Sequence, residues 1–131
     1  MIGWVDGREQ WGNFMRMIAA LNTVAFLVGC NVALADPVGR YDCEGTNPGK
    51  DTGYKCTVVV ERTGDTYSVK WNVGGSSFTG TGIGNRDFIA VSYSSGNQTG
   101  LALYAPEGDN WQGVWTYAGG RKMGAERWVR R

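Results

Sequence analysis

The sequence predicts an all-β protein, a small antiparallel up-and-down barrel of about eight strands, preceded by an N-terminal signal or hydrophobic helix. Two observations lead to this prediction. From Gly39 onward, short runs of β-branched and aromatic residues alternate with glycine-rich turns, and no stretch shows helical spacing. Before this region, a positively charged start and an apolar run are followed by small residues, as in a bacterial export signal.

The N-terminal region divides into two parts. Residues 1–14 are a charged leader without a strand or capped-helix pattern, and we interpret them as an upstream extension, with the true start at Met15 or Met17. The alternative is a cytoplasmic tail before an uncleaved anchor. Residues 15–35 carry the signal, which ends in Ala33-Leu34-Ala35, the small-residue pattern that signal peptidase cleaves. Cleavage there would leave residues 36–131 as a single domain, periplasmic or secreted.

Two other outcomes for this signal stay open. Leu27-Val28-Gly29-Cys30 is similar to the lipobox of bacterial lipoproteins, so Cys30 is a candidate lipidation site that would tether the domain to a membrane. The short distance from Cys30 to the first strand favours the soluble form. The segment from Met17 to Ala35 is about as long as the shortest membrane spans, so it could also remain as an uncleaved anchor. All three outcomes place the barrel outside the cytoplasm.

Turn residues bound each predicted strand. The clearest strand is Asp65–Val73, where apolar and polar residues alternate, and the turn Thr63-Gly64-Asp65 pairs it with the strand before it. This alternation and that around Trp115 place Tyr67, Trp71 and Trp115 in the core. Glycines within the runs fit strands that bend or lie under a large side chain. The predicted strands are Gly39–Cys43, Tyr54–Arg62, Asp65–Val73, Ser76–Ile83, Phe88–Ser94, Thr99–Ala105, Trp111–Tyr117 and Ala125–Val129.

Cysteine usage predicts a disulfide between Cys43 and Cys56, because Cys30 would be removed or acylated and two thiols remain in an oxidising compartment. The bond would join the first strand to the second and contribute roughly 3 kcal/mol. A metal site at this pair is disfavoured, because the chain contains no histidine. We therefore expect no cofactor and no metal.

Composition argues against several functions. A formal net charge of +1 gives no case for a nucleic-acid partner. The basic C-terminal stretch, residues 121–131, is expected to be a solvated end, although it could touch phospholipid or acidic polysaccharide. The absence of histidine excludes the usual nucleophilic triads. Gly80–Gly84 lacks the Lys-Ser/Thr of a nucleotide loop, so its glycines are attributed to strand curvature. On composition alone, a glycosidase pair could come from four carboxylates, Asp42, Glu44, Asp87 and Glu126. No cleft signature accompanies them, so no catalytic residue is assigned.

Aromatic residues are numerous for so small a domain and suggest a binding surface. They could line the mouth of the barrel and hold an apolar ligand or a sugar face, or form a protein-binding surface, although most of them could equally be core. A barrel of eight short strands is nearly filled by its own side chains and has room for one small ligand at best. The candidate binding aromatics are Tyr93, Tyr104, Trp111 and Tyr117.

Several segments resemble small exported barrel proteins of alphaproteobacteria that are often labelled fibronectin-binding-like. The segments are Gly39–Pro48, Gly53–Lys55, Tyr67–Trp71, Gly80–Ile83, Ala90–Tyr93, Gly100–Tyr104 and Gly113–Thr116. The resemblance covers nearly all of the domain but consists of fold-forming Gly, Tyr and Trp positions. It implies an exported β-barrel and transfers no catalytic motif.

These observations lead us to expect a non-enzymatic binding module, outside the cytoplasm, that recognises a protein or glycan partner through loops at one barrel end. One alternative is an inhibitor of a lysozyme or protease that inserts a rigid loop, with Ser94–Thr99 and Pro106–Asn110 as the candidates. Another is a membrane-anchored accessory subunit of an envelope complex.

Overall fold

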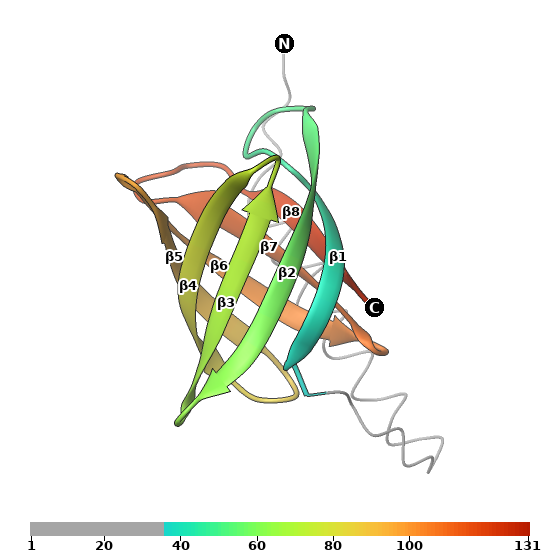
Figure 1. Cartoon of the computed structure of the whole chain (residues 1–131). Helices are drawn as coiled ribbons and strands as arrows, with labels where there is room; N and C mark the ends of the chain where they lie inside the picture. Colours follow the sequence, from blue (N-terminus) through green and yellow to red (C-terminus); the bar gives the residue numbers. More distant parts are fainter. Residues whose placement is uncertain (1–35) are drawn as a thin grey trace. The chain divides into compact units, whose positions relative to one another are not determined.

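The computed structural model describes residues 36–131, and these form a closed barrel of eight antiparallel strands (Figure 1). Each strand pairs with its neighbours along the chain, and the last strand closes onto the first. The strands are β1 (Gly39–Thr46), β2 (Gly53–Thr63), β3 (Thr66–Val73), β4 (Ser76–Gly84), β5 (Ile89–Ser95), β6 (Gln98–Glu107), β7 (Asn110–Tyr117) and β8 (Gly124–Arg130). The predicted fold class is confirmed. The expected leader, the signal or anchor and the lipidation site Cys30 lie outside the described residues.

All eight predicted strands form, and their ends differ from the prediction by a few residues. The largest difference is in β1, which continues past Cys43 to Thr46 because Glu44 and Gly45 still pair with both β2 and β8. Four of the five basic residues in the C-terminal stretch are exposed, as expected of a solvated end. The predicted strand within this stretch forms β8, and its closure onto β1 removes the edges that an open sheet would expose.

The barrel interior contains one face of every strand. In β3 the side chains of Tyr67, Val69 and Trp71 are buried, as their alternation with polar residues predicts. On β8 the same alternation turns Glu126 and Trp128 inward. The core is therefore aromatic to an unusual degree and includes one buried carboxyl group.

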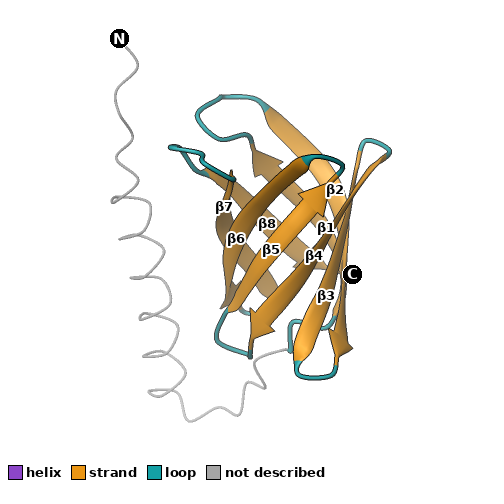
Figure 2. Cartoon of the chain, turned by 90° about the vertical axis from the view of Figure 1, so that its left-hand side faces the viewer, coloured by secondary structure: helices purple, strands orange, loops and turns teal. Residues whose placement is uncertain are grey.

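The strand connections define two ends of the barrel (Figure 2). The cavity end carries the connections 47–52, 74–75, 96–97 and 118–123. The base carries the connections 64–65, 85–88 and 108–109, together with residues 36–38, which lead into β1. Tight turns with glycine at positive φ, such as Gly64 at 61° and Gly96 at 56°, join β2 to β3 and β5 to β6.

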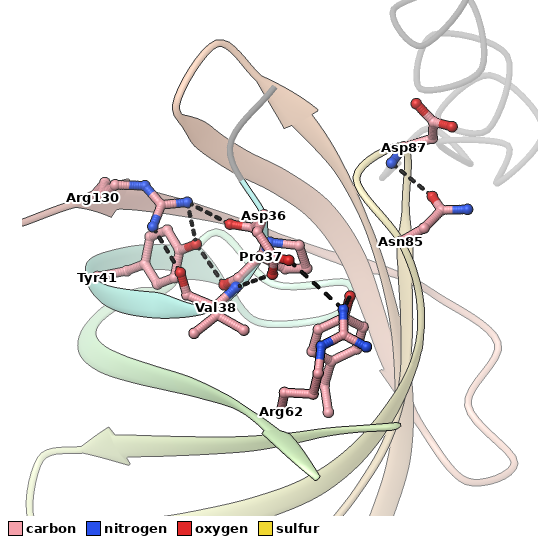
Figure 3. A network of polar contacts seen from close by, with 9 residues as sticks. Asp36, Pro37, Val38, Tyr41, Arg62, Asn85, Asp87 and Arg130 are labelled. Atoms are coloured by element: carbon pink, nitrogen blue, oxygen red, sulfur yellow. Dashed lines mark hydrogen bonds and ion pairs between the residues drawn. The ribbon is translucent and has the colours of Figure 1, made fainter. Parts of the chain in front are cut away.

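Arg130 closes the base (Figure 3). Its guanidinium donates hydrogen bonds to the backbone oxygens of Asp36 and Val38 at 2.8 and 2.9 Å and to the Tyr41 hydroxyl at 2.7 Å. The Tyr41 hydroxyl in turn donates to the backbone oxygen of Pro37 at 2.6 Å. These contacts fix the segment before β1 across the end of the barrel.

Glycines inside the barrel make room for the large rings, as predicted. A Cβ atom on Gly80 would come within 3.2 Å of the Trp71 ring, and one on Gly100 within 2.4 Å of Cζ of Tyr93. A Cβ atom on Gly113 would lie 2.5 Å from the Tyr104 ring. The rings therefore lie close to the glycines of the neighbouring strands, where a larger residue would have no room.

The predicted disulfide between Cys43 and Cys56 is confirmed, with the two Cα atoms 4.8 Å apart on paired positions of β1 and β2. Both residues are buried on the inner face. The bond favours an oxidising compartment outside the cytoplasm. Among residues 36–131, no helix has the length and apolar character needed to cross a membrane.

Candidate functional site: an aromatic cavity around a buried carboxylate

A cavity of about 310 Å³ lies inside the cavity end of the barrel. Seven aromatic residues line it: Tyr54, Trp71, Phe78, Tyr93, Tyr104, Trp115 and Tyr117. The remaining lining residues are Val73, the amides Asn47 and Gln98, and Glu126. The cavity lies at the lower end of the size range of small-molecule sites and has their usual composition, with apolar walls and few polar groups.

Glu126 is 7% exposed and accepts four hydrogen bonds from aromatic side chains. Its Oε1 accepts from the indole Nε1 of Trp71 at 2.8 Å, the indole Nε1 of Trp128 at 2.7 Å and the Tyr104 hydroxyl at 2.9 Å. Its Oε2 accepts from the Tyr54 hydroxyl at 2.5 Å. Indole nitrogens donate only, so Oε1 acts as an acceptor towards Trp71 and Trp128, and the two tyrosine hydroxyls complete the set of donors.

The position of Glu126 follows from the alternation of β8 and the closure of the barrel. Gly124, Glu126 and Trp128 face inward, and the pairing of β8 with β1 brings Glu126 beside the disulfide. One carboxylate oxygen and the two sulfur atoms lie within 4.8 Å of one another. Since both sulfurs are bonded in the disulfide, the group offers no thiolate to a metal ion.

Three of the cavity tyrosines have raised pKa values. For Tyr54 and Tyr104, burial is the main cause, and the negative charge of Glu126 adds to it, so the pKa of each hydroxyl lies well above its ordinary range. Burial, Tyr117 and Glu126 raise the pKa of Tyr93 to about 12. These hydroxyls therefore remain protonated donors at neutral pH.

Ring contacts extend through the barrel from the base to the mouth of the cavity. Trp128 packs against Tyr104 with ring centroids 4.1 Å apart, and Trp71 meets Tyr93 edge-on at 5.9 Å. Trp115 then contacts Tyr93 at 6.2 Å and Tyr117 at 5.1 Å, both edge-on. Such contacts hold the walls of the cavity in place without an occupant. The buried Nε1 of Trp115 has no hydrogen-bond partner in the described part of the chain.

Three of the four candidate binding aromatics line the cavity, namely Tyr93, Tyr104 and Tyr117. The fourth, Trp111, is fully buried at the base beside Trp128 and lies outside the lining. Trp71 and Trp115, which were assigned to the core, pack in it and also face the cavity. Sequence reasoning did not select Tyr54, Phe78, Asn47 or Gln98 as candidate binding residues, because they come from three strands and the connection 47–52 and line one cavity only when the barrel closes.

The candidate carboxylates do not come together. Glu126 lies inside the barrel, whereas Asp42, Glu44 and Asp87 are exposed on its outer surface or in a loop. The two candidate inhibitory loops also separate. Ser94–Thr99 surrounds the turn between β5 and β6 at the cavity end, and Pro106–Asn110 surrounds the turn between β6 and β7 at the base. The two loops therefore cannot enter one cleft together.

The fold and site together define a closed eight-stranded barrel that surrounds an aromatic cavity with a carboxylate at its inner end. No protein-family model, no curated protein and no solved structure matches this chain.

Proposed function

We propose that this protein is an exported, non-enzymatic binding module that takes a small organic molecule, or a small projecting group of a larger partner, into the cavity of its barrel. The observation that supports this most strongly is the cavity itself, because a volume of about 310 Å³ remains inside a barrel whose core is otherwise filled. The binding surface is then the inside of the cavity end and not the connecting loops alone.

The residues around the cavity also favour binding over catalysis. Among residues 36–131, Glu126 is the only carboxylate that lines the cavity, and the four hydrogen bonds that it accepts there come from side chains that hold it in place. Since the sequence has no histidine, a general base would have to come from another group. A fixed acceptor surrounded by rings is suited to orienting a ligand.

Bound material from the native host tests this proposal. We expect native mass spectrometry of the protein from its own cells to show a small adduct that denaturation releases. Val73→Trp should fill the mouth of the cavity and abolish the adduct, whereas Leu101→Trp should retain it because Leu101 is 57% exposed on the outer surface. Absence of any adduct, together with no binding of a panel of neutral, cationic and anionic small molecules at millimolar concentration, would contradict the proposal.

Export is part of the same proposal and is tested by intact mass. A mass that begins at Asp36 and rises by two hydrogens on reduction would support a soluble form with the disulfide. A mass that begins at Cys30 with added acyl chains would instead indicate a lipoprotein. An intact N-terminus without the reduction shift would contradict export.

A further inference from the structure

The cavity has an uncompensated negative charge. Glu126 is the one charged residue in its lining, and no lysine or arginine side chain reaches the cavity within residues 36–131. The donors to Glu126 are two indoles and two phenols, all neutral. None of the ion pairs among the described residues includes Glu126. The hydrogen bonds stabilise the carboxylate, but they do not cancel its charge.

This charge acts on what enters the cavity. The raised pKa values of Tyr54 and Tyr104 have the charge of Glu126 as their second cause after burial, so its field extends to hydroxyls on β2 and β6. An anion in the cavity would meet the same field without a compensating cation, whereas a cation would neutralise it. Surrounding protein strengthens both effects relative to water.

The aromatic walls select among cations. The face of an aromatic ring attracts a cation, and rings of Trp71, Tyr93 and Trp115 lie around the cavity. Rings replace little of the hydration shell of a metal ion or a bare ammonium group, because few oxygens face the ligand. A weakly hydrated cation with methyl or alkyl groups on its nitrogen has little hydration to lose and fits apolar walls.

Of the two oxygens of Glu126, Oε2 has more capacity left to interact with a ligand. Oε1 already accepts three hydrogen bonds, whereas Oε2 accepts one, from Tyr54. At the mouth, the side-chain amides of Asn47 and Gln98 can hydrogen bond to a polar group at the other end of the ligand. A cavity of about 310 Å³ holds the volume of about ten water molecules, and so a ligand with a similar number of non-hydrogen atoms.

We propose that the cavity binds a small alkylated ammonium compound, with its cationic group beside Oε2 of Glu126 among the aromatic rings and its polar end at Asn47 and Gln98. This inference rests on the proposed function and adds the class of ligand. The charge of the site then determines which molecules bind, and the rings determine which cations are accepted.

Three probes of similar size separate the contribution of charge to affinity from the contribution of apolar burial. Choline carries the cation, dimethylbutanol is its neutral carbon isostere, and dimethylbutanoate supplies an anion of similar size. Binding to the full-length protein is measured by calorimetry and by fluorescence, since Trp71 and Trp115 lie in the cavity wall. We expect choline to bind at least about tenfold more tightly than dimethylbutanol and dimethylbutanoate not to bind detectably.

Glu126→Gln removes the charge and keeps the shape. The amide oxygen can accept from Trp71, Tyr104 and Trp128, and the amide nitrogen can donate to the Tyr54 hydroxyl oxygen. We expect choline affinity to fall about tenfold or more in this variant while dimethylbutanol affinity changes less than about twofold. Leu101→Trp, with its substitution on the outer surface, should bind all three probes as the natural chain does.

The comparison of probes on the natural chain stands even if Glu126→Gln fails to fold. Failure of choline to bind more tightly than dimethylbutanol, including no binding of either, would overturn the assignment of a cation. If dimethylbutanol bound as well as choline, and Val73→Trp abolished both, the assignment would fail while the proposed function would hold. Preferential binding of dimethylbutanoate would overturn the assignment in the same way.

Discussion

The indole Nε1 of Trp71 and the Oε1 of Glu126 lie 2.8 Å apart across the inside of the barrel, although they are 55 residues apart in sequence. Trp71 is on β3 and Glu126 is on β8, and two strands lie between them in the closed sheet. Their hydrogen bond therefore depends on closure of the barrel. It also links the stability of the core to the chemistry of the cavity, which the following predictions address.

Glu126→Leu should destabilise the protein by about 3–5 kcal/mol, the usual cost of breaking a buried polar network. The change leaves the indoles of Trp71 and Trp128 without an acceptor in the core. Glu126→Gln retains an acceptor and should cost about 1–2 kcal/mol. Unfolding in urea with equal slopes for the three proteins would measure both values. A Leu variant as stable as the natural chain would show that the network does not stabilise the fold.

Gly113→Ala should destabilise the barrel by about 1–3 kcal/mol, because its Cβ has no room. The new atom would lie 2.3 Å from the backbone oxygen of Leu103 and 2.5 Å from the Tyr104 ring. Displacement of that ring would also weaken the Tyr104 hydrogen bond to Glu126.

Gly64→Ala is the matched control for this prediction. Apart from Gly64 and its two chain neighbours, no atom of the described residues lies within 4 Å of its Cβ position, so its cost is the positive φ of 61° alone, about 1 kcal/mol. Thermal unfolding of the two variants should show the larger loss for Gly113→Ala. Equal losses of stability in the two variants would mean that the Tyr104 ring moves aside freely and that its contact with the new Cβ atom does not destabilise the barrel.

Removal of the disulfide by the double change Cys43→Ala and Cys56→Ala should lower stability by roughly 3 kcal/mol. The bond closes a loop with a sequence separation of 13 between two strands that are already paired. Reductant should destabilise the natural chain by a similar amount and leave the double variant unchanged. A response of the double variant to reductant would show that the effect has another origin.

Alkaline pH should unfold the protein through its buried tyrosines. Burial is the main cause that raises the pKa of Tyr41 and of Tyr93 from the ordinary 10.0 to about 12. Between these values the unfolded chain has lost protons that the folded chain retains, so stability is complete below pH 10.0 and falls as pH rises towards about 12. The loss is about 1.4 kcal/mol per pH unit for each such group.

Urea midpoints and tyrosinate absorbance measured over the same pH range would test this prediction. Tyr93→Phe removes one titrating group and should make the fall in stability with pH less steep. Native-state titration of every tyrosine near its ordinary value would contradict it.

Arg130→Lys should cost about 1–3 kcal/mol, because an ammonium group cannot reproduce the fork of hydrogen bonds to Asp36, Val38 and Tyr41. Arg131→Lys is the control and should cost less than about 1 kcal/mol, since its ion pair with Asp42 is exposed. Choline binding should be the same in both variants, because Arg130 lies at the base and the cavity opens at the other end. A loss of binding in Arg130→Lys would show that the two ends are coupled.

Much of the fold could be predicted from local patterns. Alternation identified the inward face of β3, and turn residues located the breaks between strands, because both depend on neighbours in the chain. Of the candidate binding aromatics, which were selected on aromatic character alone, Tyr93, Tyr104 and Tyr117 line the cavity, and their role in binding stays a prediction. Trp111 has the same character but packs at the base, and its depth along the barrel depends on the register of β6, β7 and β8.

Glu126 shows most clearly what could not be predicted from the sequence. Its sequence neighbours suggest an ordinary strand residue, and sequence reasoning grouped it with three carboxylates that turn out to be exposed. A carboxylate two residues before an inward tryptophan is the signal that could have drawn attention to it. Its role depends on donors from β2, β3, β6 and β8.

The sequence by itself determined the approximate strands, their turns, the face that β3 buries and the cysteines that pair, since each depends on local periodicity or on adjacent strands. Only the tertiary structure decided that a cavity remains, that it lies at one end, and that Glu126 lines it together with seven aromatic residues of the described chain. The physical reason is closure. Pairing β8 with β1 brings together side chains from strands that are distant in sequence, and no local pattern in the chain specifies which of these side chains become neighbours.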